Sequence, residues 1–319
     1  MVLVSWLAWS IGGALTAGGT DGTTTRRADW ARFHGLGWAV GYSRPKASPS
    51  KAGGRVAGTI PSVSPSRPGS NHPTRPTVSS YLAPPAPIPS QAQPALPDEG
   101  LWQPLVSLHG QTAIRAAFLR PDGQYTSERV GVAWLNQKLV KMVLHPGYGT
   151  PGGSGWSQPS QVPNSQRDSL LATFNSGFLM PAAQGGYWQD GTAAVPLRLG
   201  AASMVLFKDG HVDVVRWNDA NPGPDVAAVR QNLTLLVDNG SITPEVNNAS
   251  WGATLGGGAY VWRSAVGIRQ DGALVFVVGP SMSARSLANI MHDAGAVRAM
   301  ERDINPAWTN FITYTQARA

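Results

Sequence analysis

The sequence predicts an α+β fold with a mixed, largely antiparallel β-sheet core and a few flanking helices. Short apolar runs separated by turn residues recur from Leu101 to the C-terminus. Two pairs of these runs flank an Asp-Gly dipeptide, which is typical of a tight antiparallel hairpin. A clear helical spacing of apolar residues begins only at Ser283. Strands therefore dominate the prediction.

The composition limits the function classes. The chain has 319 residues, 42% of them hydrophobic, which is enough for a sizeable core in one or two domains. It has no cysteine, which excludes disulfides, thiolate metal sites and a cysteine nucleophile. The net charge of +7 arises mainly in the first 100 residues, which carry nine Lys or Arg and four Asp or Glu. The remainder has no basic run, so we expect no nucleic-acid partner.

The N-terminal third predicts export. Residues 1–19 are uncharged and mostly apolar, which indicates a signal peptide or transmembrane anchor. This predicts a location on the extracytoplasmic face of the cell membrane, tethered through the N-terminus, or secretion. A buried helix is the alternative interpretation of residues 1–19, because no basic residue precedes the segment and Arg26 and Arg27 follow it. Residues 20–100 contain a short predicted helix at about 23–34. A Pro/Ser/Ala-rich linker, extended or disordered, follows that helix.

Residues 101–319 form the predicted folded domain. A helix is expected from an N-cap at Ser283 to Gly295, because apolar residues recur on one face and Gly favours the position after a helix. Asp-Gly turns predict two hairpins. The predicted strands are 112–119, 130–135, 139–144, the hairpin pair 203–207 and 211–217, the hairpin pair 265–269 and 273–278, and 296–300.

The sequence has no pattern of a metal or cofactor site. The six His residues do not pair at ligand spacing and there is no HExxH, so no transition metal is expected. The sequence does not exclude a site in which Asp and backbone oxygens hold a hard cation. No GxSxG elbow, Walker loop or GxGxxG is present, and we expect no cofactor.

Two carboxylates are the first candidates for acid–base chemistry. Glu301 and Asp303 end the strand that follows the predicted helix. Residues i and i+2 of a strand share a face, with Cβ atoms roughly 6–7 Å apart. Two carboxylates in one cleft would separate their pKa values, giving one acid and one base. The alternative is a structural role, in which they form ion pairs with Arg298 or Arg302.

An amide and a guanidinium are further candidates. Asn175 follows an apolar strand and could bond sugar hydroxyls or a phosphoryl oxygen, although Asn is also common in ordinary turns. Arg263 precedes the second hairpin and could bind a phosphate with two parallel hydrogen bonds. An ordinary surface position is the alternative for Arg263.

These segments together resemble the phosphodiester glycosidase family, in the form found in actinobacterial exported proteins. The block FNSGF matches at Asn175, Gly177 and Phe178, and LLVDNG matches at Asn239 and Gly240. RSAVGI, the second hairpin, the helix and the closing acidic strand follow in the same order. The resemblance implies a hydrolase that cleaves a sugar from a sugar–phosphate diester, with a sugar-phosphate or cell-wall glycan as its substrate.

The resemblance also implies site roles. Asp303 and Glu301 would be catalytic, Arg263 would bind the phosphate, and Asn175 and Asn305 would orient the sugar. The remaining predicted substrate-binding residues are Gly177, Phe178 and Asn239.

The end of the chain departs from the family pattern. The family usually closes with Asp-Gly-Gly-Gly-Ser, whereas here Asp303 is followed by Ile304-Asn305-Pro306-Ala307. Pro306 removes a donor and prevents the close backbone approach that glycines allow. A non-catalytic glycan-binding protein of the cell envelope is therefore the alternative function. The chain ends sixteen residues after Asp303, which leaves open a domain truncated at its C-terminus.

Overall fold

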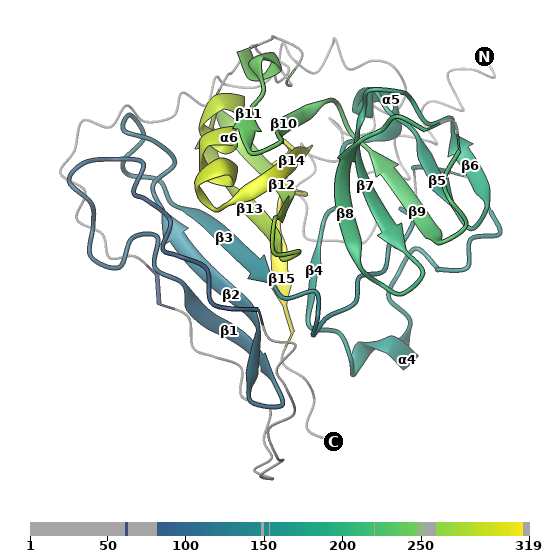
Figure 1. Cartoon of the computed structure of the whole chain (residues 1–319), viewed down its shortest axis with the longest axis horizontal. Coiled ribbons are helices and arrows are strands. Elements are labelled where there is room, and N and C mark those ends of the chain that lie inside the picture. Colours follow the sequence, from purple (N-terminus) through teal and green to yellow (C-terminus); the bar gives the residue numbers. More distant parts are fainter. Residues whose placement is uncertain are drawn as a thin grey trace, which may run out of the picture. The chain divides into compact units, whose positions relative to one another are not determined.

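The computed structural model describes residues 61–62, 82–147, 150–152, 154–219, 221–247, 251 and 260–314. The predicted anchor 1–19 and the predicted helix 23–34 lie outside these residues. The described chain forms three antiparallel sheets and a few helices (Figure 1), which confirms the predicted α+β class. No helix among the described residues is both long enough and apolar enough to span a bilayer.

The largest sheet carries most of the core. Its eight strands have the order β1-β2-β3-β13-β12-β14-β10-β11, and neighbouring strands are antiparallel. Their bounds are β1 Gln103–Leu108, β2 Gln111–Leu119, β3 Val130–Leu135, β10 Leu235–Asp238, β11 Ser241–Ile242, β12 Val261–Arg269, β13 Leu274–Met282 and β14 Ala296–Asp303.

Two smaller sheets and four short helices complete the described part. The second sheet has the order β6-β5-β9-β7-β8, and β15 pairs with β4. The strand bounds are β4 Ala172–Phe174, β5 Tyr187–Gln189, β6 Thr192–Val195, β7 Ala202–Phe207, β8 Val212–Arg216, β9 Val226–Gln231 and β15 Phe311–Thr313. The helices are α4 Asn164–Arg167, α5 Met180–Ala183, the 3-10 helix η1 Pro244–Asn247 and α6 Ala284–Asp293.

Both Asp-Gly hairpins are confirmed, as β7–β8 and β12–β13. The predicted strand 139–144 is wrong: this segment is irregular, although its apolar side chains still reach the core. The side chain of Asn136 accepts a hydrogen bond from the Lys138 amide at 3.0 Å, which turns the chain as β3 ends. The Met142 amide then bonds the Gly210 carbonyl at 2.8 Å without starting a ladder.

Helix α6 has the predicted limits. The Ser283 hydroxyl accepts from the Ser286 amide at 3.0 Å, and the Ser286 hydroxyl accepts from the Ser283 amide at 2.8 Å. Gly295 follows the helix with a φ of +86°, which is left-handed backbone that favours glycine. A Cβ at Gly267 of β12 would lie 2.6 Å from the Met291 side chain. Close packing of α6 on the sheet therefore requires glycine there.

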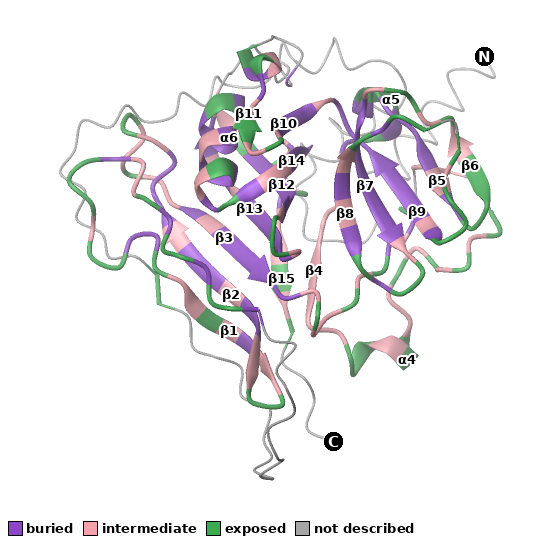
Figure 2. Cartoon of the chain, viewed as in Figure 1, coloured by how far each residue is buried: buried purple, intermediate pink, exposed green. Residues whose placement is uncertain are grey.

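The large sheet is covered on both faces. One face packs on α6 through Leu287, Ile290 and Met291. The other packs against the second sheet, in a core that joins Phe276 and Met300 to residues of β7 and β8. Figure 2 shows the resulting burial along β3, β7, β9 and β13. Strands covered on both sides are expected to be continuously apolar, as β13 is over its first half.

Residues 82–100 pack on the domain, although they were assigned to the linker from composition. Ile88 is 2% exposed and belongs to the same core cluster as α6. The Ile88 amide donates to the Gly100 carbonyl at 3.0 Å. A Cβ at Gly100 would lie 1.9 Å from the Ile88 carbonyl oxygen, so only glycine permits this approach. The described part of the domain thus includes Leu82, before the predicted boundary at 101.

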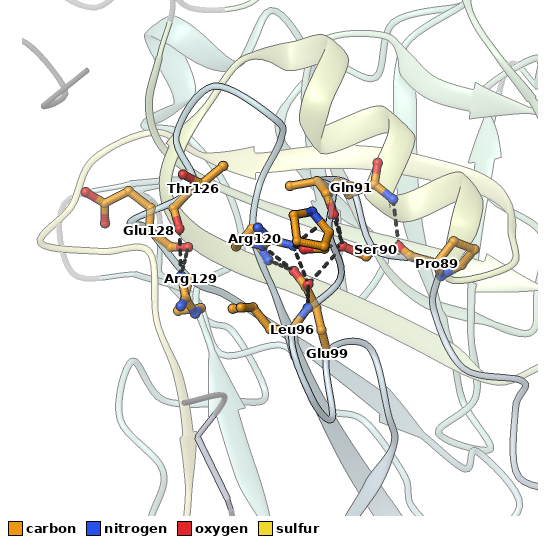
Figure 3. A network of polar contacts seen from close by, with 11 residues as sticks. Pro89, Ser90, Gln91, Leu96, Glu99, Arg120, Thr126, Glu128 and Arg129 are labelled. Atoms are coloured by element: carbon orange, nitrogen blue, oxygen red, sulfur yellow. Dashed lines mark hydrogen bonds and ion pairs between the residues drawn. The ribbon is translucent and has the colours of Figure 1, made fainter. Parts of the chain in front are cut away.

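A buried ion pair fixes this segment to the end of β2 (Figure 3). Arg120 donates to both carboxylate oxygens of Glu99, at 3.0 and 2.8 Å. The same guanidinium donates to the Ala92 carbonyl at 2.8 Å, and the Leu96 amide donates to Glu99 at 2.9 Å. Burial alone would raise the pKa of Glu99. The hydrogen bonds, led by that from Arg120, outweigh burial and hold the pKa at about 2.

We expect Glu99→Gln to lower the free energy of unfolding at pH 7 by roughly 3 kcal/mol, because Arg120 would stay buried without its anion. The pKa of Glu99 is depressed in the folded state, so its stabilisation is present above the unfolded value of 4.5 and is lost as the pH falls towards 2. The difference between variant and wild type should shrink over that range. Urea unfolding at pH 7 and pH 3 measures both effects. The control is Glu128→Gln, because Glu128 accepts from Arg129 through its backbone carbonyl at 2.9 Å and is not joined to Glu99 or Arg120 in Figure 3. Equal stability of Glu99→Gln and wild type at pH 7 would contradict the expectation.

Candidate active site

The structure brings three distant segments together at one end of the large sheet. Asn175 follows β4, Ser264 lies near the start of β12, and Asp303 is the last residue of β14. Ser264 pairs with Asp303 across the sheet. The Asn175 amide donates to Asp303 at 3.0 Å, and the Ser264 hydroxyl donates to the Asn175 oxygen at 3.3 Å. Asn175 and Asp303, which the family resemblance assigns to one site, are therefore in contact.

The turn after β14 holds the other oxygen of Asp303. The amides of Ile304 and Asn305 donate to it at 2.8 and 2.9 Å. The Asn305 side chain accepts from the Ala307 amide at 3.1 Å and so shapes the turn. Asn305 thus contacts the carboxylate through its backbone. Burial raises the pKa of Asp303 to about 6, against these hydrogen bonds, which lower it.

Glu301 and Arg263 form a buried ion pair. Their side chains are 0% and 3% exposed, and the guanidinium also donates to the carbonyls of Met282 and Trp251, both at 2.8 Å. Burial raises the pKa of Glu301 to about 7, while Arg263 lowers it. Arg263 was predicted to bind a phosphate. In the structure its guanidinium instead donates to Glu301 and to the carbonyls of Met282 and Trp251. Glu301 is likewise closed to solvent.

Gly177 and Phe178 lie over a second arginine. The Phe178 carbonyl accepts from Arg230, which is 4% exposed. Gly177 has a φ of +142°, and a Cβ there would lie 3.2 Å from a guanidinium nitrogen of Arg230. Burial lowers the pKa of Arg230 to about 10. The two predicted residues therefore border the site through their backbone.

Asn239 does not belong to this site. It is exposed in the turn between β10 and β11, with a φ of +48°. The following amide, of Gly240, donates to the Val297 carbonyl near the start of β14. Six residues of extended strand, roughly 20 Å, separate Val297 from Asp303. The structure thus places Asn239 apart from Asn175 and Asp303, in an Asn-Gly hairpin turn.

Arg230, Asn232 and Arg302 border the site and were not predicted as site residues. The Asn232 amide donates to the Glu301 carbonyl at 2.8 Å. A register shift between β12 and β14 leaves Arg302 between the paired residues Glu301 and Asp303, and the Arg302 side chain is fully buried. The dipeptides Arg230-Gln231 and Arg302-Asp303 carry no local signal of burial. Among the described residues, no group of three or more His, Asp or Glu could hold a metal ion.

The match to a known family covers the segments that carry Asn175, Ser264 and Asp303. Residues 169–303 match the family model described as phosphodiester glycosidase, which confirms the resemblance over this region. No curated protein matches the chain.

Two similar solved structures share little sequence with this chain. One is the catalytic domain of zebrafish N-acetylglucosamine-1-phosphodiester alpha-N-acetylglucosaminidase, auto-inhibited by its pro-peptide. It is 14% identical with a TM-score of 0.46, over 66% of this chain and 77% of that chain. The other is a hypothetical protein from Synechocystis, 13% identical with a TM-score of 0.35, over 65% of this chain and 59% of that chain.

We expect Arg263→Met to lower the free energy of unfolding by roughly 3–5 kcal/mol, because Glu301 would stay buried without its cation. Adding Glu301→Leu should restore most of the loss, since the pair is then replaced by apolar side chains. The exposed pair of Arg216 and Asp238 is the control, and Arg216→Met should cost less than about 1 kcal/mol. Additive effects of Arg263→Met and Glu301→Leu in urea unfolding would show that the pair is not coupled.

Proposed function

We propose, from the premise that residues 169–303 form a phosphodiester glycosidase domain, that this protein hydrolyses the bond between a sugar and a phosphodiester. The observation that carries the proposal is Asp303. It lies at the end of a central strand with a raised pKa, held by the amide of Asn175 and two backbone amides. A carboxylate fixed in this way has one orientation towards a bound substrate.

The reaction needs one carboxylate at the anomeric carbon. The bond from that carbon to the phosphate oxygen breaks, a bond to a water oxygen forms, and the phosphate monoester leaves with the bonding electrons. Phosphate is a good leaving group, so it needs no strong acid. Asp303 takes the proton of the attacking water as a base, or it bonds the anomeric carbon first and water then releases it. Both courses require ionised Asp303.

Glu301 and Arg263 have a positioning role in this scheme. Their ion pair joins β12 to β14 two residues before the end of β14, and Arg263 also joins β13 through the Met282 carbonyl. Asp303 therefore extends from a strand end that is fixed from two sides. This supports Asp303, rather than Glu301, as the carboxylate that reaches the substrate.

Export is the second part of the proposal. Residues 1–19 have the length and apolar composition of a signal peptide or membrane anchor. A polymeric sugar phosphate of the cell envelope would be available to a domain tethered outside the membrane. Fractionation of cells that produce the full chain would test this location. Recovery in the cytoplasm alone would contradict it.

Glycan binding without turnover is the alternative, and one observation favours it. The side chain of Trp308, five residues after Asp303, is 48% exposed. Exposed aromatic rings are common at recognition surfaces. Pro306 also replaces part of the glycine run that closes the family pattern. Specific retention on glycans, with no turnover of any phosphodiester, would support this function.

We expect Asp303→Asn to abolish sugar release from hexose 1-phosphodiesters by the full chain, because the amide cannot act as base or nucleophile. The loss should exceed about 100-fold in kcat. Asp209→Asn is the control, since that carboxylate is in an exposed hairpin turn with its side chain 69% exposed. Released sugar measures the rate, and circular dichroism checks the fold. Turnover by Asp303→Asn at the wild-type rate would remove Asp303 from the mechanism.

We expect the activity to rise with pH through about 6, since burial raises the pKa of Asp303 to that value and the ionised form is the reactive one. Below pH 6, kcat/KM should fall about tenfold per pH unit as Asp303 takes a proton. Rates between pH 4.5 and 8 provide the measurement. A rate that falls as the pH rises through 6 would instead make Asp303 an acid.

A further inference from the structure

A buried cation next to Asp303 lacks its hydrogen-bond partners. The Arg302 side chain is fully buried, and Nη1 contacts the Met300 sulfur at 3.6 Å. Its Nε and Nη2 atoms are buried and have no hydrogen-bond partner among the residues that the structure describes. A buried guanidinium without an acceptor is costly, because the lost hydration is not replaced. The site therefore has unused donor capacity for an anion.

The charges around Arg302 point to what is missing. Burial lowers the pKa of Arg302 to about 9, Arg230 lowers it further, and Asp303 raises it. Both guanidinium groups thus interact electrostatically with the one carboxylate of Asp303. Glu301 does not restore the balance, because it is paired with Arg263. The cluster of Arg230, Arg302 and Asp303 keeps an excess of one positive charge, which one monovalent anion would neutralise.

A half-buried segment, residues 175–177, borders the cluster. Asn175, Ser176 and Gly177 are half-buried, and they are fixed there by hydrogen bonds from Asn175 to Asp303 and from Arg230 to the Phe178 carbonyl. Gly177 has no side chain above the Arg230 guanidinium, where a Cβ would fill the space. An incoming anion could replace the Phe178 carbonyl as the acceptor of Arg230. Binding of an anion at Arg230 therefore requires this segment to move.

We propose that Arg302 and Arg230 form the binding site for the phosphoryl group of the substrate, in place of Arg263. The inference rests on the proposed function for the identity of the anion. A phosphodiester carries a single negative charge and offers several acceptor oxygens to the Nε and Nη2 fork of a guanidinium. The Arg302 guanidinium and the Asp303 carboxylate are close enough to shift each other's pKa, so a phosphoryl group held at Arg302 keeps the sugar–phosphate bond near the reacting carboxylate.

The test compares the full chain with Arg302→Met, using inorganic phosphate as the probe. Phosphate should raise the thermal midpoint of the wild type above that in sodium chloride of equal ionic strength, because it binds the folded state. Arg302→Met should weaken phosphate binding by about tenfold or more, because a hydrogen-bonded charge is lost. Without phosphate this variant should be at least as stable as the wild type, since an apolar side chain replaces an unpaired buried charge.

Arg298→Met is the matched control. Arg298 lies on the same strand, and its side chain pairs with Asp213 at 2.7 Å. It should keep the phosphate response of the wild type. Arg302→Gln provides a second substitution of different polarity. If both Arg302 variants unfold without phosphate, Arg302 is a structural cation and the proposal is overturned.

The outcomes distinguish a failure of the proposed anion site from a failure of the proposed hydrolase function. An equal phosphate response in wild type and Arg302→Met, with sugar release unchanged, overturns the anion site and leaves the hydrolase standing. A phosphate response that is lost in Arg302→Met supports the site even where no phosphodiester is hydrolysed, and the hydrolase then fails alone. Loss of both the response and sugar release in Arg302→Met, but not in Arg298→Met, supports both.

Discussion

The end of β14 places Glu301, Arg302 and Asp303 in the interior one after another, and the surrounding structure is arranged to hold this charge. Each ionised group loses its hydration there, which favours the neutral form of the acids and raises their pKa values. Arg263 compensates Glu301, and backbone amides with Asn175 partly compensate Asp303. Packing on both faces of the sheet supplies the stability that this cluster costs.

Local chemistry explains which parts of the fold the sequence could predict. Asp-Gly turns define the hairpins β7–β8 and β12–β13, and Ser283 with Gly295 defines the ends of α6. These signals act within a few residues, so no knowledge of tertiary structure is needed. The segments 139–144 and 82–100 were mispredicted because their burial depends on distant partners. Composition alone cannot show that a Pro-rich stretch has a buried arginine to pair with.

For the candidate site, too, local signals were predictable from the sequence and tertiary contacts were not. Strand alternation indicated Glu301 and Asp303, but only the resemblance to the phosphodiester glycosidase family grouped Asn175 with Asp303, which the structure places in contact. The full burial of Arg302 beside a register shift could not be predicted, because strand periodicity does not reveal such a shift. Arg263 has the residue type of a phosphate ligand, but only the structure shows that Glu301 occupies it. Residue type indicates a capacity, and pairing decides whether it is available.

In the proposed site, the buried charges would allow a bound phosphoryl group and an ionised Asp303 to lie next to each other. A phosphoryl group bound at Arg302 would add negative charge next to Asp303 and favour its protonated form. Arg230 opposes this effect, since a second guanidinium leaves the cluster neutral rather than negative when the substrate is bound. Asp303 can then stay ionised beside an anionic substrate. A single arginine would neutralise the phosphoryl group but leave Asp303 with no cation and only its hydrogen-bond donors, so the second arginine is needed to keep the carboxylate ionised.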